Sequence, residues 1–236
     1  MDSTEYRTVD VDHWYVKSRD EDHREFLVGR RDRNAELATA GRVFLEFCKG
    51  FEALDELKQC VTVFGSARFK EGHQYYELAR ALGKRLAQEG YTVMTGGGPG
   101  IMEAANRGAK EGGGRSLGCN IVLPMEQKHN QYLDRFVEFE HFFVRKVMLI
   151  KFSQAFVVMP GGFGTLDEVF ETLTLMQTGK LHSFPVIAMG TKFWDHLRDF
   201  IKQTMIEEQT IDPGDLDLVD STDSVDEAIA LIKGKG

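Results

Sequence analysis

The segment that decides the fold is Ala155-Phe-Val-Val-Met159, followed at once by Pro160-Gly-Gly-Phe-Gly-Thr-Leu-Asp-Glu168. A short apolar run rich in β-branched residues predicts a buried strand, and the glycines after it predict a turn that opens a helix. From Cys60 onward, short apolar runs of this kind alternate with segments of helical periodicity. Strands are predicted at 61–64, 91–94, 117–123, 136–143, 155–159, 185–189 and 216–219, and helices at 75–89, 101–111, 144–152, 166–176, 193–207 and 224–232. This alternation predicts the α/β class, with a Rossmann-like, doubly wound, mostly parallel sheet and helices on both faces.

The first 57 residues have a different pattern. From Glu21 to Lys58 the apolar side chains recur at helical spacing among charged residues, without strand-like runs. We expect 1–57 to be a helical extension of one or two helices, packed on the outside of a Rossmann-like nucleotide-binding catalytic domain at 58–236. The aromatic residues of this extension exceed what a peripheral helix exposes on a monomer, so packing within the chain and self-association both remain open. They are Phe26, Phe44, Phe47 and Phe51.

Composition excludes several functional classes. The 236 residues carry 29 Lys and Arg against 37 Asp and Glu, a net charge of −8, which argues against nucleic acid or an anionic membrane as the main partner. No basic start leads into an apolar run, and no apolar stretch approaches the roughly 20 residues that span a bilayer. The three cysteines are odd in number and far apart, and the seven histidines are scattered. We therefore expect a cytoplasmic protein with no metal and no membrane contact.

Three predicted strand-to-helix turns are rich in glycine. They are Gly65-Ser66 after the first strand, Gly96-Gly97-Gly98-Pro99-Gly100 after the second, and Pro160-Gly161-Gly162-Phe163-Gly164-Thr165 after the fifth. Ligands of parallel sheets bind outside the carboxyl ends of the strands, where these turns lie. Glycine lets the backbone approach a ligand, and a helix N-terminus offers free N–H groups to an anion. One such turn is ambiguous, but two that open helices predict a phosphate site.

Comparison with known motifs narrows the class of phosphate-containing ligand that this site is expected to bind. A dinucleotide site requires G-x-G-x-x-G after the first strand, where this chain has one glycine, and the Walker A sequence is absent. Dinucleotide redox chemistry and P-loop hydrolysis are both disfavoured. A mononucleotide or sugar phosphate remains as the expected ligand, with no cofactor.

Charged residues gather at the same predicted edge of the sheet. Arg145 and Lys146 follow the fourth strand, whereas Glu168 and Glu171 lie on one face of the helix after the fifth. Thr165 to Glu168 also fits a capping box, which would give Glu168 a purely structural role in the first helical turn. Cations are disfavoured at a helix start, so a ligand anion or the Glu168 carboxylate is expected to compensate Arg145 and Lys146. The coincidence of acids and bases favours a functional site over a simple cap.

These segments resemble a known family. Gly96-Gly-Gly-Pro-Gly-Ile-Met102, the pair Arg145-Lys146 and Pro160-Gly-Gly-Phe-Gly-Thr-Leu-Asp-Glu168 are similar to the signatures of the LOG (LONELY GUY) family. Its members are cytokinin riboside 5′-monophosphate phosphoribohydrolases that are often mislabelled as lysine decarboxylases. The resemblance covers about residues 61–190. The N-terminal extension and Gly118-Cys-Asn-Ile-Val-Leu-Pro-Met-Glu-Gln127 resemble the longer, type II branch.

The resemblance implies an activity and a set of site residues. The implied reaction is hydrolysis of the N-glycosidic bond of a nucleoside 5′-monophosphate, such as AMP or isopentenyladenosine monophosphate, giving free base and ribose 5-phosphate. Arg145 and Glu168 correspond to the catalytic pair. The implied substrate-binding residues are Gly65, Ser66, Gly97, Gly98, Gly100, Glu126, Asn130, Lys146, Gly161, Gly162, Gly164, Thr165 and Glu171, with Glu126 and Asn130 at the sugar or base.

Further implications concern assembly and competing functions. The resemblance implies a homo-oligomer, either a dimer or a hexamer. Lysine decarboxylation would need pyridoxal phosphate on a lysine, and neither Lys146 nor Lys151 has a recognisable setting for it. The other alternative is a non-catalytic nucleotide-binding or carrier protein of the same fold.

Overall fold

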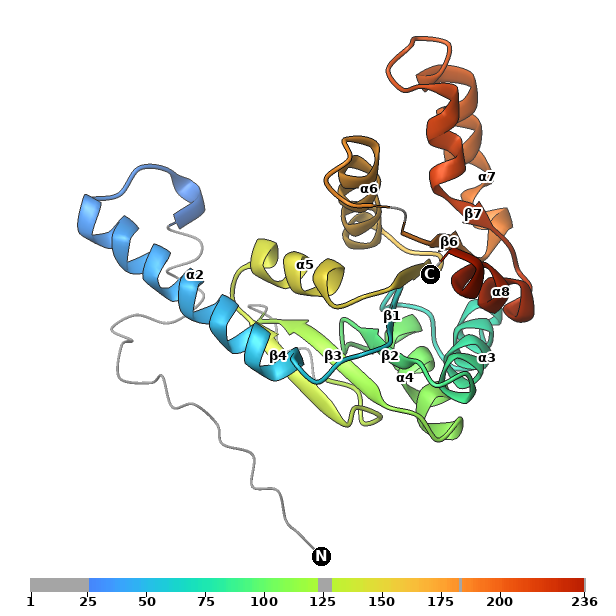
Figure 1. Cartoon of the computed structure of the whole chain (residues 1–236), viewed down its shortest axis with the longest axis horizontal. Helices are drawn as coiled ribbons and strands as arrows, with labels where there is room; N and C mark the ends of the chain where they lie inside the picture. Colours follow the sequence, from blue (N-terminus) through green and yellow to red (C-terminus); the bar gives the residue numbers. More distant parts are fainter. Residues whose placement is uncertain (1–25, 123–128, 183, 236) are drawn as a thin grey trace, which may run out of the picture.

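The computed structural model describes residues 26–122, 129–182 and 184–235, and its centre is one parallel sheet of seven strands (Figure 1). The strands lie in the order β4-β3-β2-β1-β5-β6-β7. Their bounds are β1 Cys60–Phe64, β2 Thr92–Thr95, β3 Ser116–Ile121, β4 Arg135–Phe139, β5 Ala155–Val158, β6 Val186–Ala188 and β7 Asp220–Ser221. The predicted fold class is confirmed. Because the strand order reverses between β1 and β5, the ends of these two strands form the crevice where such sheets bind ligands.

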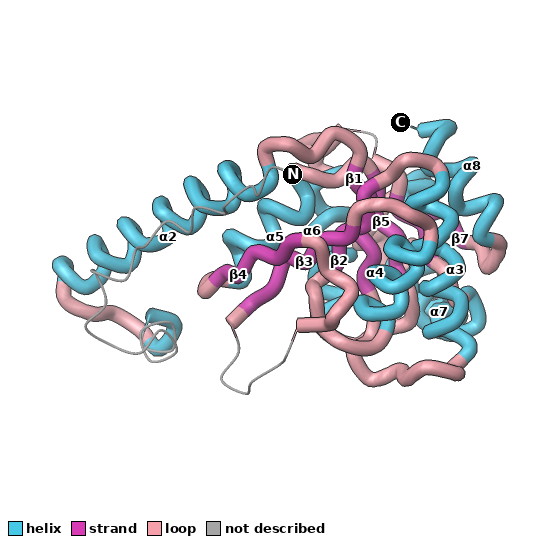
Figure 2. The backbone as a smooth tube through the Cα atoms, turned by 90° about the horizontal axis from the view of Figure 1, so that it is seen from below, coloured by secondary structure: helices cyan, strands magenta, loops and turns pink. Residues whose placement is uncertain are grey.

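Helices cover both faces of the sheet (Figures 1 and 2). One face carries α3, α4 and α8, and the other carries α2, α5, α6 and α7. Their bounds are α2 Arg33–Leu54, α3 Gln74–Gln88, α4 Ile101–Glu111, α5 Phe142–Lys151, α6 Phe163–Gln177, α7 Thr191–Phe200 and α8 Val225–Lys235. This two-sided covering explains why the strand runs are continuously apolar rather than alternating.

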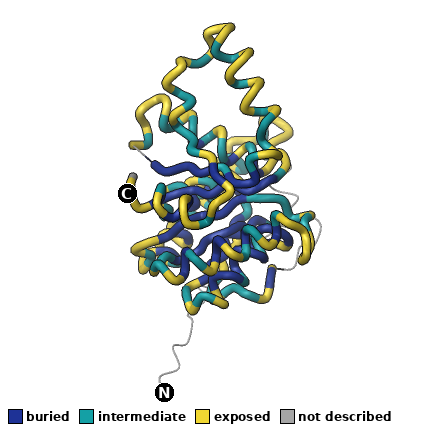
Figure 3. The backbone as a smooth tube through the Cα atoms, turned by 90° about the vertical axis from the view of Figure 1, so that its right-hand side faces the viewer, coloured by how far each residue is buried: buried dark blue, intermediate teal, exposed yellow. Residues whose placement is uncertain are grey.

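Two hydrophobic cores result from the alternation of side chains along the strands. Val61 and Val63 of β1 face the α3–α4–α8 layer, whereas Phe64 faces the layer of α5 and α6. Every residue of β1, β2, β3 and β5 is buried, as the dark central strands of Figure 3 show. The central strands therefore form a rigid base for the turns at their carboxyl ends.

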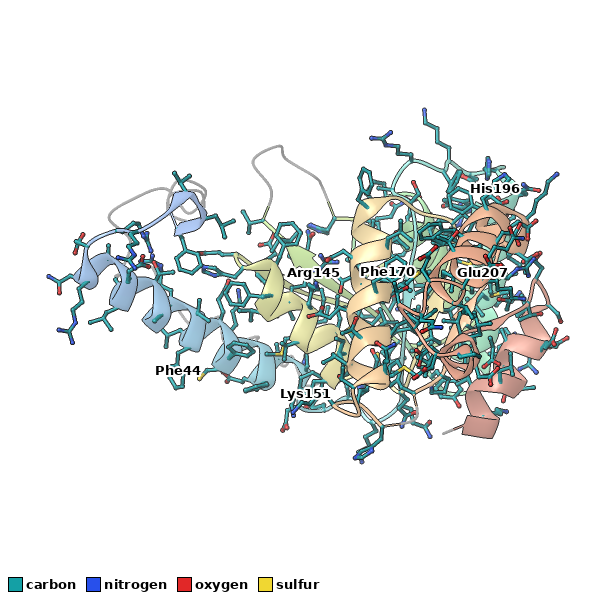
Figure 4. All side chains as sticks on the ribbon, turned by 90° about the horizontal axis from the view of Figure 1, so that it is seen from above. Phe44, Arg145, Lys151, Phe170, His196 and Glu207 are labelled. Carbon is teal, nitrogen blue, oxygen red and sulfur yellow. The ribbon has the colours of Figure 1, made fainter. Side chains whose placement is uncertain are left out.

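The described part of the N-terminal extension is dominated by the 22-residue helix α2. Its N-cap is Asp32, whose carboxylate accepts hydrogen bonds from the N–H groups of Asn34 and Ala35. Phe47 packs on the core of the sheet, whereas Phe44 is 66% exposed and points away from the body of the protein (Figure 4). The expected helix on the outside of the sheet is thus present, and it leaves part of its apolar surface uncovered.

Several predicted boundaries were wrong. The predicted strand at 216–219 is mostly a 3-10 helix, η3 Pro213–Leu218, and the short strand β7 follows it. The predicted helix at 193–207 ends as α7 at Phe200 and continues as a π-helical turn, η2 Ile201–Met205. The strand predicted to reach 143 ends at Phe139, because α5 already begins at Phe142. None of the described helices combines the length and apolarity needed to cross a membrane.

Candidate functional site

Ser66 joins the three glycine-rich turns at the crevice between β1 and β5. Its N–H donates to the carbonyl oxygen of Pro160 at 3.0 Å, and its own carbonyl oxygen accepts from the N–H of Ile101 at 3.0 Å. A Cβ at Gly65 would lie 2.5 Å from the Ile101 side chain, and one at Gly100 would lie 2.4 Å from the Ser66 carbonyl oxygen. The glycines at these two positions therefore allow the turn after β1 to contact the start of α4.

Asn130 holds the turn after β2. Its amide nitrogen donates to the carbonyl oxygens of Gly97 and Gly98, and it is buried. The N–H of Gly97 already donates to Thr95 Oγ1 at 2.9 Å. Gly97 therefore uses its N–H within the turn, and the Asn130 amide nitrogen contacts the backbone of that turn and Asn106 Oδ1, while the predicted roles of both residues toward a ligand stay predictions. This turn supports the site by packing and hydrogen bonding.

The N-terminus of α6 is the open end of the site. Gly162 is the N-cap, and no described side chain caps the helix. A Cβ at Gly162 or Gly164 would meet no atom within 4 Å, whereas one at Gly161 would collide with the Thr165 side chain. Gly162 and Gly164 therefore border open space at the start of α6. The first N–H groups of a helix have no intrahelical partner, and helix N-termini of this kind bind anions.

The capping box that competed with a functional interpretation of Glu168 is not formed by Thr165 and Glu168. Because α6 begins at Phe163, Thr165 lies within its first turn and Glu168 lies in its second turn. A residue in the second turn cannot reach back to cap the first N–H groups. The structural role that competed with a functional role for Glu168 is thereby removed.

Arg145 links four elements around Glu168. It lies on α5, beside α6 in Figure 4, and its Nε donates to the carbonyl oxygen of Cys119 on β3 at 3.0 Å. A Cβ at Gly96 would lie 3.3 Å from Nη2, so the guanidinium lies over the turn after β2. Its Nη1 lies 3.7 Å from Glu168 Oε1, and the Arg145 side chain is 13% exposed. The predicted pair of Arg145 and Glu168 is thus adjacent in space.

Glu168 is a buried carboxylic acid with spare hydrogen-bonding capacity. Its side chain is 3% exposed, and Oε2 has no hydrogen-bond partner among the described residues. Burial raises the pKa of Glu168 to about 7, and Asp167 and Glu171 add to that rise, whereas Arg145 and Lys146 oppose it. A carboxyl group that titrates near neutral pH and retains a free oxygen is suited to proton transfer or to stabilising a cation.

Lys146 is paired differently from Arg145. Its Nζ lies 3.0 Å from Asp167 and 2.9 Å from Glu171 Oε2, so it bridges two acids of α6. Burial lowers the pKa of Lys146, but its bonds to Glu171 and Asp167 outweigh that effect and the net pKa is raised. Lys146 therefore stays charged and fastens α5 to α6, and Glu171 is its partner.

Some site features were not predicted, and one prediction lies outside the described residues. Glu126 belongs to 123–128, which the structure does not describe. The carbonyl of Cys119 was missed because a backbone acceptor leaves no signal in the sequence. Within the described part of the chain, the group of His and acidic side chains close enough to share a metal ion is Glu46, Glu140 and His141, and it includes no candidate site residue.

The sequence is similar to a family model and to curated proteins. A family model described as possible lysine decarboxylase matches residues 102–232. Over 148 residues the chain is 32% identical to the cytokinin riboside 5′-monophosphate phosphoribohydrolase LOG of Oryza sativa subsp. japonica. That match covers 61% of this chain and only 60% of the rice protein.

Solved structures show the same fold. The X-ray structure of TM1055 is 29% identical, with a TM-score of 0.57, and the match covers 75% of this chain and 99% of that one. The molybdenum cofactor binding protein from Rippkaea orientalis has a TM-score of 0.58 over 75% of this chain and 96% of that chain. At 24% identity the second likeness speaks for the fold alone. Since the family model spans more than half of the sequence, the chain belongs to the LOG family, whose model is described as possible lysine decarboxylase.

Proposed function

We propose that this protein hydrolyses the N-glycosidic bond of a nucleoside 5′-monophosphate and releases the free base and ribose 5-phosphate. The observation that carries the proposal is the buried Glu168 carboxyl, 3.7 Å from Arg145 and one helical turn beyond the uncapped N-terminus of α6. An anion site beside a buried acid suits a substrate whose phosphate binds at the N-terminus of α6 and whose reacting carbon lies next to Glu168. The name of the rice relative supports the same reaction class.

Glu168 supplies the chemistry in this mechanism. Cleavage of an N-glycosidic bond passes through a ribosyl cation of oxocarbenium character, and the ionised Glu168 carboxylate stabilises that cation. The same carboxylate accepts a proton from the attacking water, whose hydroxyl bonds to the ribosyl carbon, and the departing nitrogen takes up a proton so that the base leaves in neutral form. With a pKa near 7, Glu168 is ionised in a large fraction of molecules at neutral pH and remains basic enough to take that proton.

Arg145 and α6 position the reactants. The Arg145 guanidinium is held by the Cys119 carbonyl and faces Glu168, so it favours the ionised carboxylate. The first N–H groups of α6, at Phe163, Gly164 and Thr165, bind the 5′-phosphate. Energy from this non-reacting group orients the ribose, so AMP should be cleaved and adenosine should not. Adenine and isopentenyladenine nucleotides are the substrate classes to compare first.

Incubation with AMP tests the proposal. The wild-type protein should release adenine, measured by chromatography, and Glu168→Gln should lower kcat by about 1,000-fold or more while AMP binding persists. Glu207→Gln is the matched control, because this exposed glutamate lies on the segment after η2, far from Arg145 in Figure 4. AMP binding without adenine release by the wild type would instead support the carrier alternative.

We also propose that the protein self-associates. Support comes from α2, where Leu37, Phe44 and Phe51 follow one another at seven-residue spacing and are all exposed. Residues seven apart lie on one face of a helix, so these three form an apolar stripe. A dimer or a hexamer would cover it.

A further inference from the structure

Helix α2 is fastened to the edge of the sheet next to α5. Lys49 Nζ donates to the carbonyl oxygen of Glu138 at 3.0 Å, and Arg135 Nη1 donates to the carbonyl oxygen of Ala53 at 2.8 Å. Buried Gly50 lets α2 approach α5, since a Cβ there would lie 2.8 Å from Met148 Sδ. The extension is therefore seated directly against the helix that carries Arg145.

Glu46, on α2, contacts the residues at the start of α5. Its Oε1 accepts a hydrogen bond from the N–H of Glu140, and its Oε2 lies 2.8 Å from His141 Nδ1. The Glu46 side chain is 12% exposed and the His141 side chain 2%. The His141 ring also touches the rings of Phe26 and Phe143. Both carboxylate oxygens thus fix two consecutive residues in a largely water-free setting, where hydrogen bonds to charged groups are strong.

His141 is the N-cap of α5, and this places Glu46 one step from the candidate catalytic pair. The carbonyl oxygen of His141 accepts from the N–H of Arg145 at 3.2 Å, the first intrahelical bond of α5. The position of the Arg145 backbone therefore depends on where His141 is held. The guanidinium reaches Glu168 at 3.7 Å without a direct hydrogen bond, so a small displacement of this turn changes the pairing.

We propose that Glu46 is a positioning residue: through Glu140 and His141 it fixes the first turn of α5, and thereby the placement of Arg145 against Glu168. The effect on turnover rests on the proposed function, whereas the effect on α5 does not. The N-terminal extension then contributes to the site from a helix that supplies no residue to it. Misplacement of a catalytic group by about 1 Å costs up to about 100-fold in rate.

The experiment compares three full-length variants. Glu46→Ala removes both contacts, and Glu46→Gln keeps a side-chain oxygen for the Glu140 N–H. Lys49→Ala is the matched control, because it removes a bond from α2 to the same edge of the sheet but leaves α5 untouched. The readouts are amide hydrogen exchange of 142–148, kcat and KM for AMP, and the thermal midpoint.

The expected results separate positioning from mere stability. Glu46→Ala should speed exchange at the start of α5 by about 10-fold and lower kcat by about 10- to 100-fold, with KM within about twofold of wild type. Glu46→Gln should retain most of kcat, and Lys49→Ala should leave exchange and kcat unchanged. Unaltered exchange in Glu46→Ala would overturn the proposal, as would equal losses in Lys49→Ala or in Glu46→Gln. If the wild type releases no adenine, the proposed function fails while the exchange data still decide the role of Glu46.

Discussion

The raised pKa of Glu168 makes folding stability depend on pH in a way that one substitution removes. Burial moves this pKa from 4.5 to about 7, even though Arg145 opposes the shift. Each pKa unit corresponds to about 1.4 kcal/mol, so ionised Glu168 costs the folded protein about 3 kcal/mol relative to the protonated form. Glu168→Gln abolishes this titration and keeps the size of the side chain.

The sign follows from proton binding in the two states. Between pH 4.5 and about 7 the folded protein holds a proton that the unfolded chain has released. The stability that this proton confers is fully present below pH 4.5 and is lost as the pH rises through about 7. From pH 5 to pH 8 the wild type should therefore lose roughly 2 to 3 kcal/mol more than Glu168→Gln.

Urea unfolding at both pH values measures that difference. Parallel pH dependences of the wild type and Glu168→Gln would show that Glu168 is ionised at its ordinary pKa, and the proposed role for a near-neutral acid would fail. Arg145→Met provides a second test, because it should raise the pKa of Glu168 further instead of abolishing the titration. Because Arg145 lowers the pKa of Glu168, its removal should extend the loss of stability to higher pH.

Three further substitutions test the phosphate site, the turns and the assembly. Gly164→Val should raise KM for AMP about 10-fold or more without lowering the thermal midpoint. The control Gly214→Val, where a Cβ also meets open space, should change neither KM nor the thermal midpoint. An unchanged KM in Gly164→Val would show that the phosphate does not bind at the start of α6. Gly100→Ala should lower the free energy of unfolding, measured in urea, by about 2 kcal/mol or more, because the φ of Gly100 is 71° and a Cβ there would collide with the Ser66 carbonyl oxygen. A loss under about 0.5 kcal/mol would contradict that packing. Light scattering of the wild type should exceed the 26.7 kDa of one chain and fall for Phe44→Ser, and a monomeric wild type would refute self-association.

The fold was predictable because its signals are local. Strand-like runs such as Ala155 to Met159 are long enough to be recognised, and the glycines after them mark the turns. Predictions failed where two structures share one composition. The run at 216–219 is apolar enough for a strand, but Pro213 and Asp215 organise a 3-10 turn through a capping box with Asp212. Sequence patterns alone do not resolve that competition.

The proximity of Arg145 and Glu168 was predictable from the sequence, but the contacts around them were not. Arg145 and Glu168 were identified as a pair, and they lie side by side. Asn130 was assigned to the sugar or base through the family resemblance, which could not show that its amide nitrogen also bonds to the backbone of Gly97 and Gly98. The contact of Glu46 with His141 joins residues far apart in the chain, and no periodicity reports such a contact.

The pairing of β1 with β5 also determines at which stage of folding the candidate site is complete. The β1–β5 pairing, called the seam here, joins Val61 to Ala155, which are far apart in the sequence. The β1–β2 pairing joins Cys60 to Thr92, which are closer together in the sequence. Closing the longer loop costs more chain entropy, and synthesis releases the β1–β4 half first. The turns at Ser66 and Gly96 belong to that half, but α6 follows β5. A nascent or refolding chain therefore has no complete site until the seam closes, and the return of activity on refolding reports that closure.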